Sequence, residues 1–200
     1  MASLVQIANR TLQKMGSTGT LVSLDDNVKS ARTLKASYPI VLEKELRARV
    51  WNFSKVRTTL EALVTTPAFG FTKEFQLPSD CLRVLQVGQV RLDLASIDYR
   101  TGLEALFKIE GRKILTDMAA PLPVLYVARV TDTSQFDSCF IDSFACRWAI
   151  ETCKQITGST EIKADLKRDY MLAIAEAEAA NAIENPPEAI ADSSWVLSRL

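Results

Sequence analysis

Histidine is absent from this 200-residue chain. Without histidine the chain has no Ser-His-Asp or Cys-His catalysis and no histidine metal site. It also lacks the side chain that most often moves protons near neutral pH. An enzyme built on this sequence would have to work with carboxylates, lysine or cysteine alone.

The sequence also lacks any surplus of one charge, because 24 Lys and Arg residues balance 24 Asp and Glu residues. This balance argues against a protein whose affinity comes from neutralising many phosphates. No apolar run approaches the roughly 18 residues of a membrane span. The first residues show no basic segment followed by an apolar run, so we expect no secretory signal. With 48% hydrophobic and 24% charged residues, the composition is typical of a soluble globular protein.

No Cys-x-x-Cys pair occurs among the four cysteines, which are Cys81, Cys139, Cys146 and Cys153. The last three are spaced by sevens, which on a helix places them on one stripe about 10 Å apart. That distance prevents neighbouring members from forming a disulfide or sharing a zinc ion. We interpret them as small buried hydrophobic residues in a reducing compartment.

Apolar residues at helical spacing predict two helices near each end of the chain, at about 4–15, 27–50, 135–157 and 160–184. Gly16 is a candidate left-handed stop for the first helix, and Ser159 a candidate cap for the last. Pro39 should kink or restart the second helix. The buried face of the last helix is predicted to include Ile183.

Between about 54 and 132 the apolar period shortens to that of strands. Strands are expected near 71–77, 82–87 and 124–130, with a hairpin over 107–115 that turns at Glu110 and Gly111. The sequence therefore predicts an α+β fold. An antiparallel four-helix bundle (1–53 and 133–185) is interrupted by a β-rich insertion (54–132) and followed by an extended C-terminal tail (186–200).

Three groups of side chains are candidates for chemistry or binding. The carboxylate pairs that could act as acid and base are Glu43 with Glu45, Asp93 with Asp98, and Glu176 with Glu178. Basic side chains around two aromatic residues resemble a nucleic-acid surface, and these are Arg47, Arg49, Lys55 and Arg57 around Trp51 and Phe53. A structural role is favoured for both groups. Trp195, beyond the helix stop at Pro186 and Pro187, either folds back or anchors in another protein.

Several segments occur in an order that resembles one known family. They are Ala31-Arg32, Ser37-Tyr38-Pro39, Leu46-Arg47, Trp51-Asn52-Phe53, the stretch from Phe75 to Val84, Trp148-Ala149-Ile150-Glu151, Ile156-Thr157-Gly158-Ser159, Tyr170, Pro186-Pro187, Ser194-Trp195 and Ser198-Arg199. Together they cover nearly the whole chain. This ordered set resembles the head-to-tail adaptor family of short-tailed bacteriophages, also called tail tubular protein A.

The resemblance implies a structural virion protein rather than an enzyme, with no catalytic, cofactor-binding or metal-binding residue. Members form a dodecameric ring at the head-tail junction, between the portal protein and the tail nozzle protein. The ring encloses the channel through which double-stranded DNA passes during ejection. Such a protein is assembled in the cytoplasm of the bacterial host and needs no membrane.

By the same resemblance, the portal-binding residues are expected to be Trp195, Val196, Leu197 and Arg199. The hairpin residues Glu110, Gly111 and Arg112 are expected to contact the nozzle or a neighbouring subunit. Two alternatives remain open: a carboxylate-based cell-wall hydrolase associated with a phage tail, and a DNA-binding accessory protein.

Overall fold

The computed structural model describes residues 2–92 and 106–184. Its α-helices are α1 (Leu4–Lys14), α2 (Lys29–Ala48), α3 (Ser138–Ile156) and α4 (Thr160–Ile183). Its strands are β1 (Lys55–Leu60), β2 (Lys73–Gln76), β3 (Cys81–Val87), β4 (Val90–Arg91), β5 (Phe107–Glu110), β6 (Lys113–Thr116) and β7 (Leu122–Ala128). The described residues thus form four α-helices and two small antiparallel sheets, and the predicted α+β class is confirmed.

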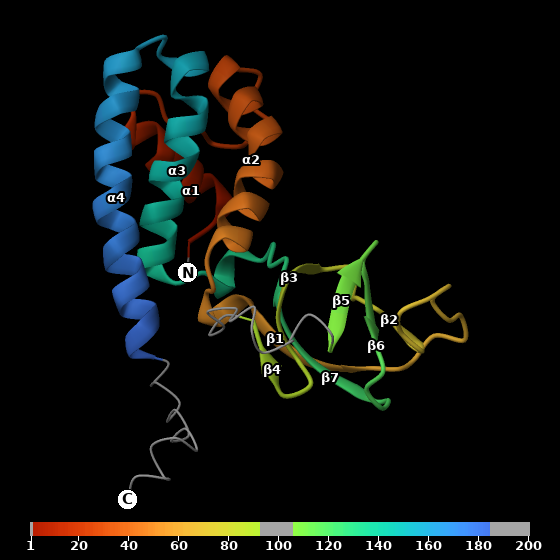
Figure 1. Ribbon diagram of the computed structural model, residues 1–200. Helices are drawn as coiled ribbons and strands as arrows, with labels where there is room; N and C mark the ends of the chain where they lie inside the picture. The colour runs from red at the N-terminus through yellow and green to blue at the C-terminus, as the bar shows by residue number, and fades with distance from the viewer. Residues whose placement is uncertain (1, 93–105, 185–200) are drawn as a thin grey trace, which may run out of the picture.

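Helix α3 is the centre of the helical part and packs against α1, α2 and α4. It runs opposite to α2 and α4, which flank it in Figure 1. Its buried face carries Phe140, Phe144 and Trp148, and Phe136, two residues before the helix, extends this aromatic row at the same interval of four residues. Neighbouring rings lie 5.1 to 5.8 Å apart between centroids. Burial of these large side chains is the main source of stability in this part of the fold.

The predicted helix boundaries are confirmed to within a few residues. The hydroxyl of Ser3 caps α1, Ser159 caps α4, and Gly16 follows α1 with a φ of 71°. Helix α2 does not restart at Pro39, because this proline lies on its exposed face. There the carbonyl of Lys35, which proline leaves without its helical partner, can meet water.

The last helix differs from the prediction at its C-terminal end. Ile183 was expected on the buried face of α4 but is 83% exposed. The buried residues Leu166, Tyr170, Ile174 and Ala177 follow a narrow stripe. At 100° per residue, Ile183 has rotated off that stripe onto the solvent side.

The two sheets pack face to face to form a second core. One sheet has the strand order β1-β7-β3-β4 and the other has the order β2-β6-β5. The core between them includes Phe75, Val84, Ile114, Val124 and Tyr126. Strand β1 was not predicted, whereas the other long strands lie where the alternation of apolar residues placed them.

The β5–β6 hairpin turns one residue later than predicted. Its central residues are Gly111 and Arg112, with φ values of 52° and 64°. Two consecutive residues with positive φ are typical of the type I′ turn, which matches the twist of a two-residue hairpin. The register, in which Glu110 pairs with Lys113, requires that turn.

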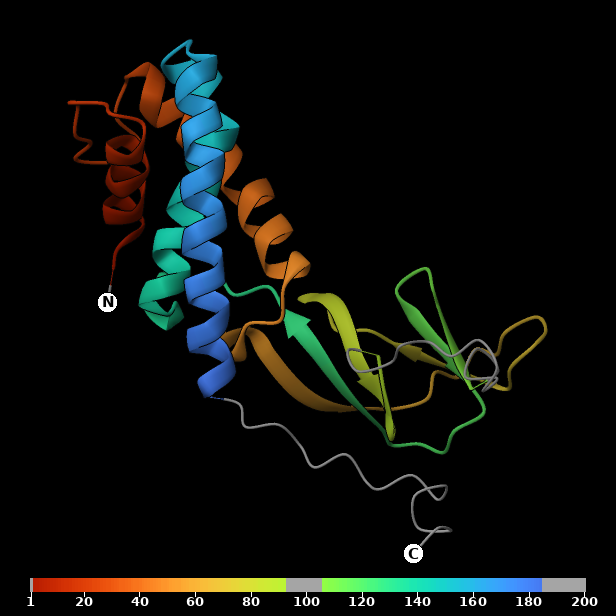
Figure 2. The same cartoon turned by 60° about the vertical axis from the view of Figure 1, so that its left-hand side comes forward.

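The β part joins one end of the helical part and extends away from it, as Figure 2 shows. The ion pair between Arg129 and Glu43, 2.6 Å long, joins the end of β7 to α2. Asn52 joins the start of β1 to the end of α4. Its backbone N–H donates to Oδ1 of Asn181 at 2.8 Å, and its Nδ2 donates to the Asn181 carbonyl at 2.7 Å.

Helix α1 is attached to α3 by a carboxylate held between two cations. Asp142 lies 2.8 Å from Nη2 of Arg10 and 2.9 Å from Nζ of Lys14. Burial alone would raise the pKa of Asp142, but its hydrogen bonds to Lys14 and Arg10 outweigh burial and hold that pKa below its ordinary value. The ionised carboxylate therefore stabilises the folded chain above the pKa that it has when unfolded.

We expect Asp142→Asn to lower the free energy of unfolding by about 1 kcal/mol at pH 7. This difference from the wild type should shrink as the pH falls through the folded-state pKa of Asp142, where the wild-type carboxylate also loses its charge. Urea titrations at several pH values measure both effects. The matched control is Asp165→Asn, which removes an exposed pair with Arg168 within α4 and should change little. Equal effects of the two variants at pH 7 would contradict the prediction.

Candidate interaction surfaces

The tip of the β5–β6 hairpin is exposed, as its predicted role in contact requires, but one of its three residues is engaged within the chain. Glu110 and Gly111 face solvent. The guanidinium of Arg112 donates to the carbonyl oxygens of Pro78, at 2.6 Å, and Ser79, at 3.3 Å. Arg112 therefore ties the hairpin to the β2–β3 turn, and Glu110 and Gly111 are the residues available for a partner.

The β2–β3 turn that receives Arg112 is held from its other side as well. The hydroxyl of Tyr126 lies 3.2 Å from Oδ1 of Asp80, and the backbone N–H of Arg129 donates to the Asp80 carbonyl at 2.8 Å. Burial, together with the charge and hydrogen bond of Asp80, raises the pKa of Tyr126 to about 12. The phenol is protonated at neutral pH and can donate to Asp80, so the β2–β3 turn that receives Arg112 is also held to β7.

The four residues expected to bind the portal, Trp195, Val196, Leu197 and Arg199, lie outside the described residues. The carboxylates Asp93 and Asp98 also lie outside them. The described chain ends at Glu184, whose carboxylate accepts a hydrogen bond from Nδ2 of Asn52 at 3.4 Å. The C-terminal segment therefore begins at the end of the helical part that carries the β part.

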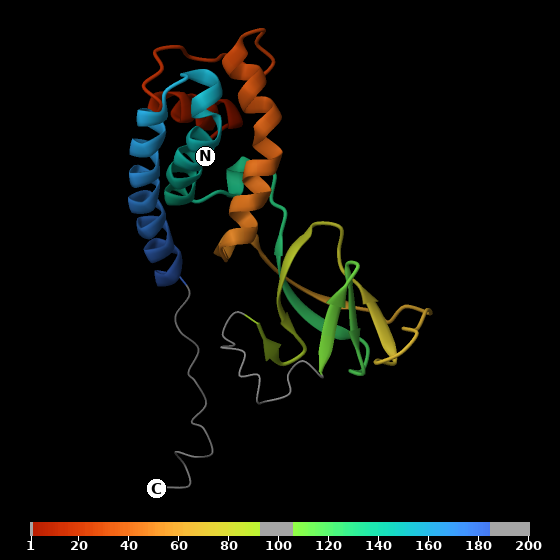
Figure 3. The same cartoon turned by 45° about the horizontal axis from the view of Figure 1, so that its top comes forward.

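A loop between β1 and β2 forms an apolar surface that the sequence prediction missed. Residues 62–72 contain no charged side chain. Val64 is fully exposed and Phe69 is 88% exposed. Figure 3 shows this loop at the end of the β part farthest from the helices. The run of 11 uncharged residues was the signal that could have revealed it.

The base of the 62–72 loop is fixed although its tip is exposed. The N–H of Leu63 donates to the Glu74 carbonyl at 2.8 Å, and the N–H of Thr72 donates to Asp117 at 2.8 Å. A hydrogen bond from Lys113 lowers the pKa of Glu74, whose carboxylate also accepts from the hydroxyl of Thr65. These contacts hold the ends of the loop and leave its apolar side chains in solvent.

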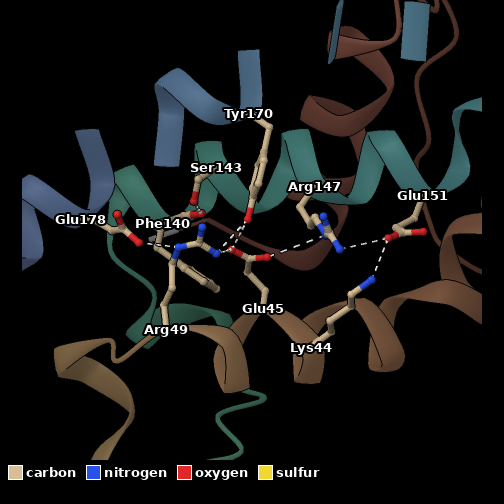
Figure 4. A network of polar contacts seen from close by, with 9 residues as sticks. All are labelled: Lys44, Glu45, Arg49, Phe140, Ser143, Arg147, Glu151, Tyr170 and Glu178. Atoms are coloured by element: carbon tan, nitrogen blue, oxygen red, sulfur yellow. Dashed lines mark hydrogen bonds and ion pairs between the residues drawn. The ribbon is translucent and has the colours of Figure 1, made fainter. Parts of the chain in front are cut away.

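Of the four candidate acid and base residues of the helical part, three are engaged in ion pairs or buried, and the fourth, Glu176, is exposed. Glu43 pairs with Arg129, and Glu178 pairs with Arg49. Glu45 is only 2% exposed and lies at the centre of the polar network in Figure 4. An acid or base in hydrolysis must reach its substrate, and Glu45 has no opening to solvent.

The network around Glu45 connects α2, α3 and α4. The Tyr170 hydroxyl donates to Oε1 of Glu45 at 2.7 Å, and Nη1 of Arg49 donates to the same oxygen at 3.3 Å. Nε of Arg147 lies 3.9 Å from Oε2 of Glu45. Burial and the charge of Glu45 raise the pKa of Tyr170. The arrangement is a structural ion cluster that holds the three helices together.

The basic side chains that bracket Trp51 and Phe53 also have structural contacts. Arg47 donates to the Leu82 carbonyl, and Arg49 contacts Glu45 and Glu178. Trp51 is 2% exposed and lies 4.9 Å from Phe140 between ring centroids. Trp51 is therefore part of the core and Phe53 packs partly buried against it, whereas Arg47 and Arg57 are the exposed cations of this group.

Within residues 2–92 and 106–184, no three acidic or cysteine side chains are grouped so that they could hold a metal ion. None of the helices in this part of the chain has the length and apolar character needed to cross a membrane. Comparisons of the chain with protein-family models and with curated proteins find no match.

Proposed function

We propose that this chain is a structural virion protein, a ring-forming adaptor that joins the portal to the tail nozzle of a short-tailed bacteriophage. Copies of the chain, twelve by the family resemblance, surround the channel through which double-stranded DNA passes. The chain acts by its shape and its contacts, with no catalytic residue, metal or cofactor.

The observation that supports this proposal most is the separation of two contact regions. The helices form one elongated part, and the β part extends from one end of it (Figure 1). The 62–72 loop, which carries the exposed Val64 and Phe69, lies at the far end of the β part. A connector has to hold neighbouring copies at its sides and a different protein at each end. Separate parts with separate exposed surfaces suit that requirement.

We assign the parts of the chain as the resemblance suggests. Residues 1–53 and 133–185 form an antiparallel four-helix bundle, 54–132 form the inserted β domain, and 186–200 form the tail. The tail residues Trp195, Val196, Leu197 and Arg199 bind the portal. Glu110 and Gly111, whose hairpin is held in place by Arg112, contact the nozzle or a neighbouring subunit. The 62–72 loop takes part in the same contact.

The test is to mix the full chain with the portal protein of the same virus and to determine mass and symmetry by native mass spectrometry and electron microscopy. We expect a closed ring of about twelve copies on the portal, as the family resemblance implies. Single, separate copies on the portal would contradict the proposal. A chain truncated after Asn185 should bind the portal more weakly, and unchanged affinity would contradict the assignment of the tail.

A further inference from the structure

The solvent side of α4 carries an apolar stripe. Met171, Leu172 and Ile183 are 64%, 74% and 83% exposed, respectively. Between them lie three exposed alanines, Ala175, Ala179 and Ala182. Positions 172, 175, 179 and 182 recur at intervals of three and four residues, the spacing with which one helix packs against another. Among the residues that the structure describes, nothing covers this α4 stripe.

Helix α2 presents an outward face of a different kind. Ile40 is 72% exposed, and Ala36 and Pro39 beside it are also exposed. One to three turns earlier on the same side lie the exposed cations Lys29 and Arg32, neither of which forms an ion pair within the described part of the chain. We call this surface the α2 face. In Figures 1 and 3, α2 and α4 lie on either side of α3, so the α2 face and the α4 stripe belong to helices on different sides of the helical part.

The two helices carry opposite net charge. Helix α2 has five basic and two acidic side chains, whereas α4 has five acidic and three basic ones. Packing α4 against α4 of another copy would bring two acidic helices together, which costs free energy. Packing α4 against α2 of another copy brings opposite charges together around the apolar residues. Charge therefore favours the second arrangement.

We propose that the α4 stripe of one copy packs against the α2 face of the next copy, with Leu172 and its alanines close to Ile40. Because the two surfaces differ and lie on two sides of one subunit, the contact is heterologous, and repeating it closes a ring if the rotation fits. The alanines permit a close approach of the two helices. This inference rests on the proposed function and adds the surfaces through which the copies meet.

Disulfide crosslinking tests the contact directly. The variant Ile40→Cys/Leu172→Cys places a thiol on each surface, and the native chain is a suitable background because Cys81, Cys146 and Cys153 are buried and Cys139 is half-buried. After mild oxidation of the full chain, alone and mixed with the portal protein, we expect a ladder of multimers on a non-reducing gel. On the same gel the wild type and each single variant should run as monomers, because they associate without forming a crosslink: a heterologous contact brings no two identical thiols together.

A complementary variant tests the energy of the contact. Leu172→Asp should weaken self-association at least about tenfold, because it places a charge where an apolar side chain is buried. Val22→Asp is the matched control, since Val22 is 89% exposed but lies in the loop between α1 and α2. Sedimentation velocity measures association, and circular dichroism verifies that both variants are folded.

The outcomes separate this inference from the proposed function. Rings on the portal without a ladder from the double-cysteine variant would overturn the α2–α4 contact and leave the adaptor proposal standing. Dimers formed by Leu172→Cys alone would show that α4 meets α4 and would also overturn the contact. Single, separate copies in every sample would contradict both proposals.

Discussion

Glu45→Ala is expected to lower the free energy of unfolding by about 3 to 5 kcal/mol. The carboxylate is 2% exposed and accepts hydrogen bonds from Tyr170 and Arg49. Alanine would remove the buried counter-charge of Arg49 and Arg147 and leave them only their more exposed partners, Glu178 and Glu151. It would also leave the buried Tyr170 hydroxyl without its acceptor, and removal of one partner of a buried ion cluster is strongly destabilising. Chemical denaturation followed by far-UV circular dichroism measures the loss.

Glu43→Ala is the matched control for this prediction. Glu43 lies two residues away on the same helix, but its pair with Arg129 is 42% exposed on both sides. A pair exposed to that degree contributes at most about 1 kcal/mol. The contrast between two neighbouring glutamates thus isolates the effect of burial. Losses of similar size in the two variants would contradict a structural role for the buried cluster.

Glu45→Gln separates charge from hydrogen bonding at the same site. Glutamine keeps the size of the side chain and one acceptor oxygen for Tyr170, but it removes the charge that faces Arg49 and Arg147. We expect an intermediate loss, because the hydrogen bond survives and the ion pairs do not. If Glu45→Gln were as stable as the wild type, the ionic contacts would contribute nothing.

The helices were predictable because their signals are local. Apolar residues at intervals of three and four located all four helices. Ser159 marked the start of α4 because its hydroxyl caps helices well, and Gly16 marked the end of α1 because glycine readily adopts a positive φ. The α+β class followed from the spacing of apolar residues, which changes from that of helices to that of strands between residues 54 and 132. The hairpin turns one residue later than predicted because Glu110 pairs with Lys113, which leaves Gly111 and Arg112 as its central residues, and the apolar pattern of the two strands does not define this register.

The buried cluster was harder to predict, because its members come from three helices. Glu45 lies between Val41 and Leu46 on the apolar side of α2, and the helical spacing of the apolar residues is enough to show this placement. Its partners Arg147 and Tyr170 lie more than a hundred residues away in sequence. Without knowledge of how the helices pack, Glu45 could be paired only with its neighbour Glu43 as a candidate acid and base.

The exposed surfaces were missed for a different physical reason. An apolar residue in a sequence is normally interpreted as core, as Ile183 was, so neither the outer face of α4 nor the 62–72 loop was identified as an exposed surface. Only the packing of α4 on α3 through four buried residues shows that Leu172 is left outside. A chain that assembles with copies of itself carries interface residues whose pattern resembles that of a core.

Trp51→Ala should also lower the free energy of unfolding by about 3 to 5 kcal/mol, because it removes a large side chain that is 2% exposed. Trp51 follows α2 and precedes β1, and its ring contacts Phe53 and Phe140. A cavity at this position would loosen the packing between the helical part and the first strand. Urea unfolding followed by circular dichroism measures the loss.

Substitution by phenylalanine makes the prediction more specific. Nε1 of Trp51 has no hydrogen-bond acceptor among the described residues, whereas Nε1 of Trp148 donates to the hydroxyl of Ser37 at 2.8 Å. Both side chains are almost fully buried, so the two replacements remove a similar area. Trp51→Phe also removes an unpaired buried donor, and Trp148→Phe instead breaks a hydrogen bond, so Trp148→Phe should cost about 1 kcal/mol more. Equal losses in the two variants would contradict the expected contribution of the Trp148–Ser37 hydrogen bond.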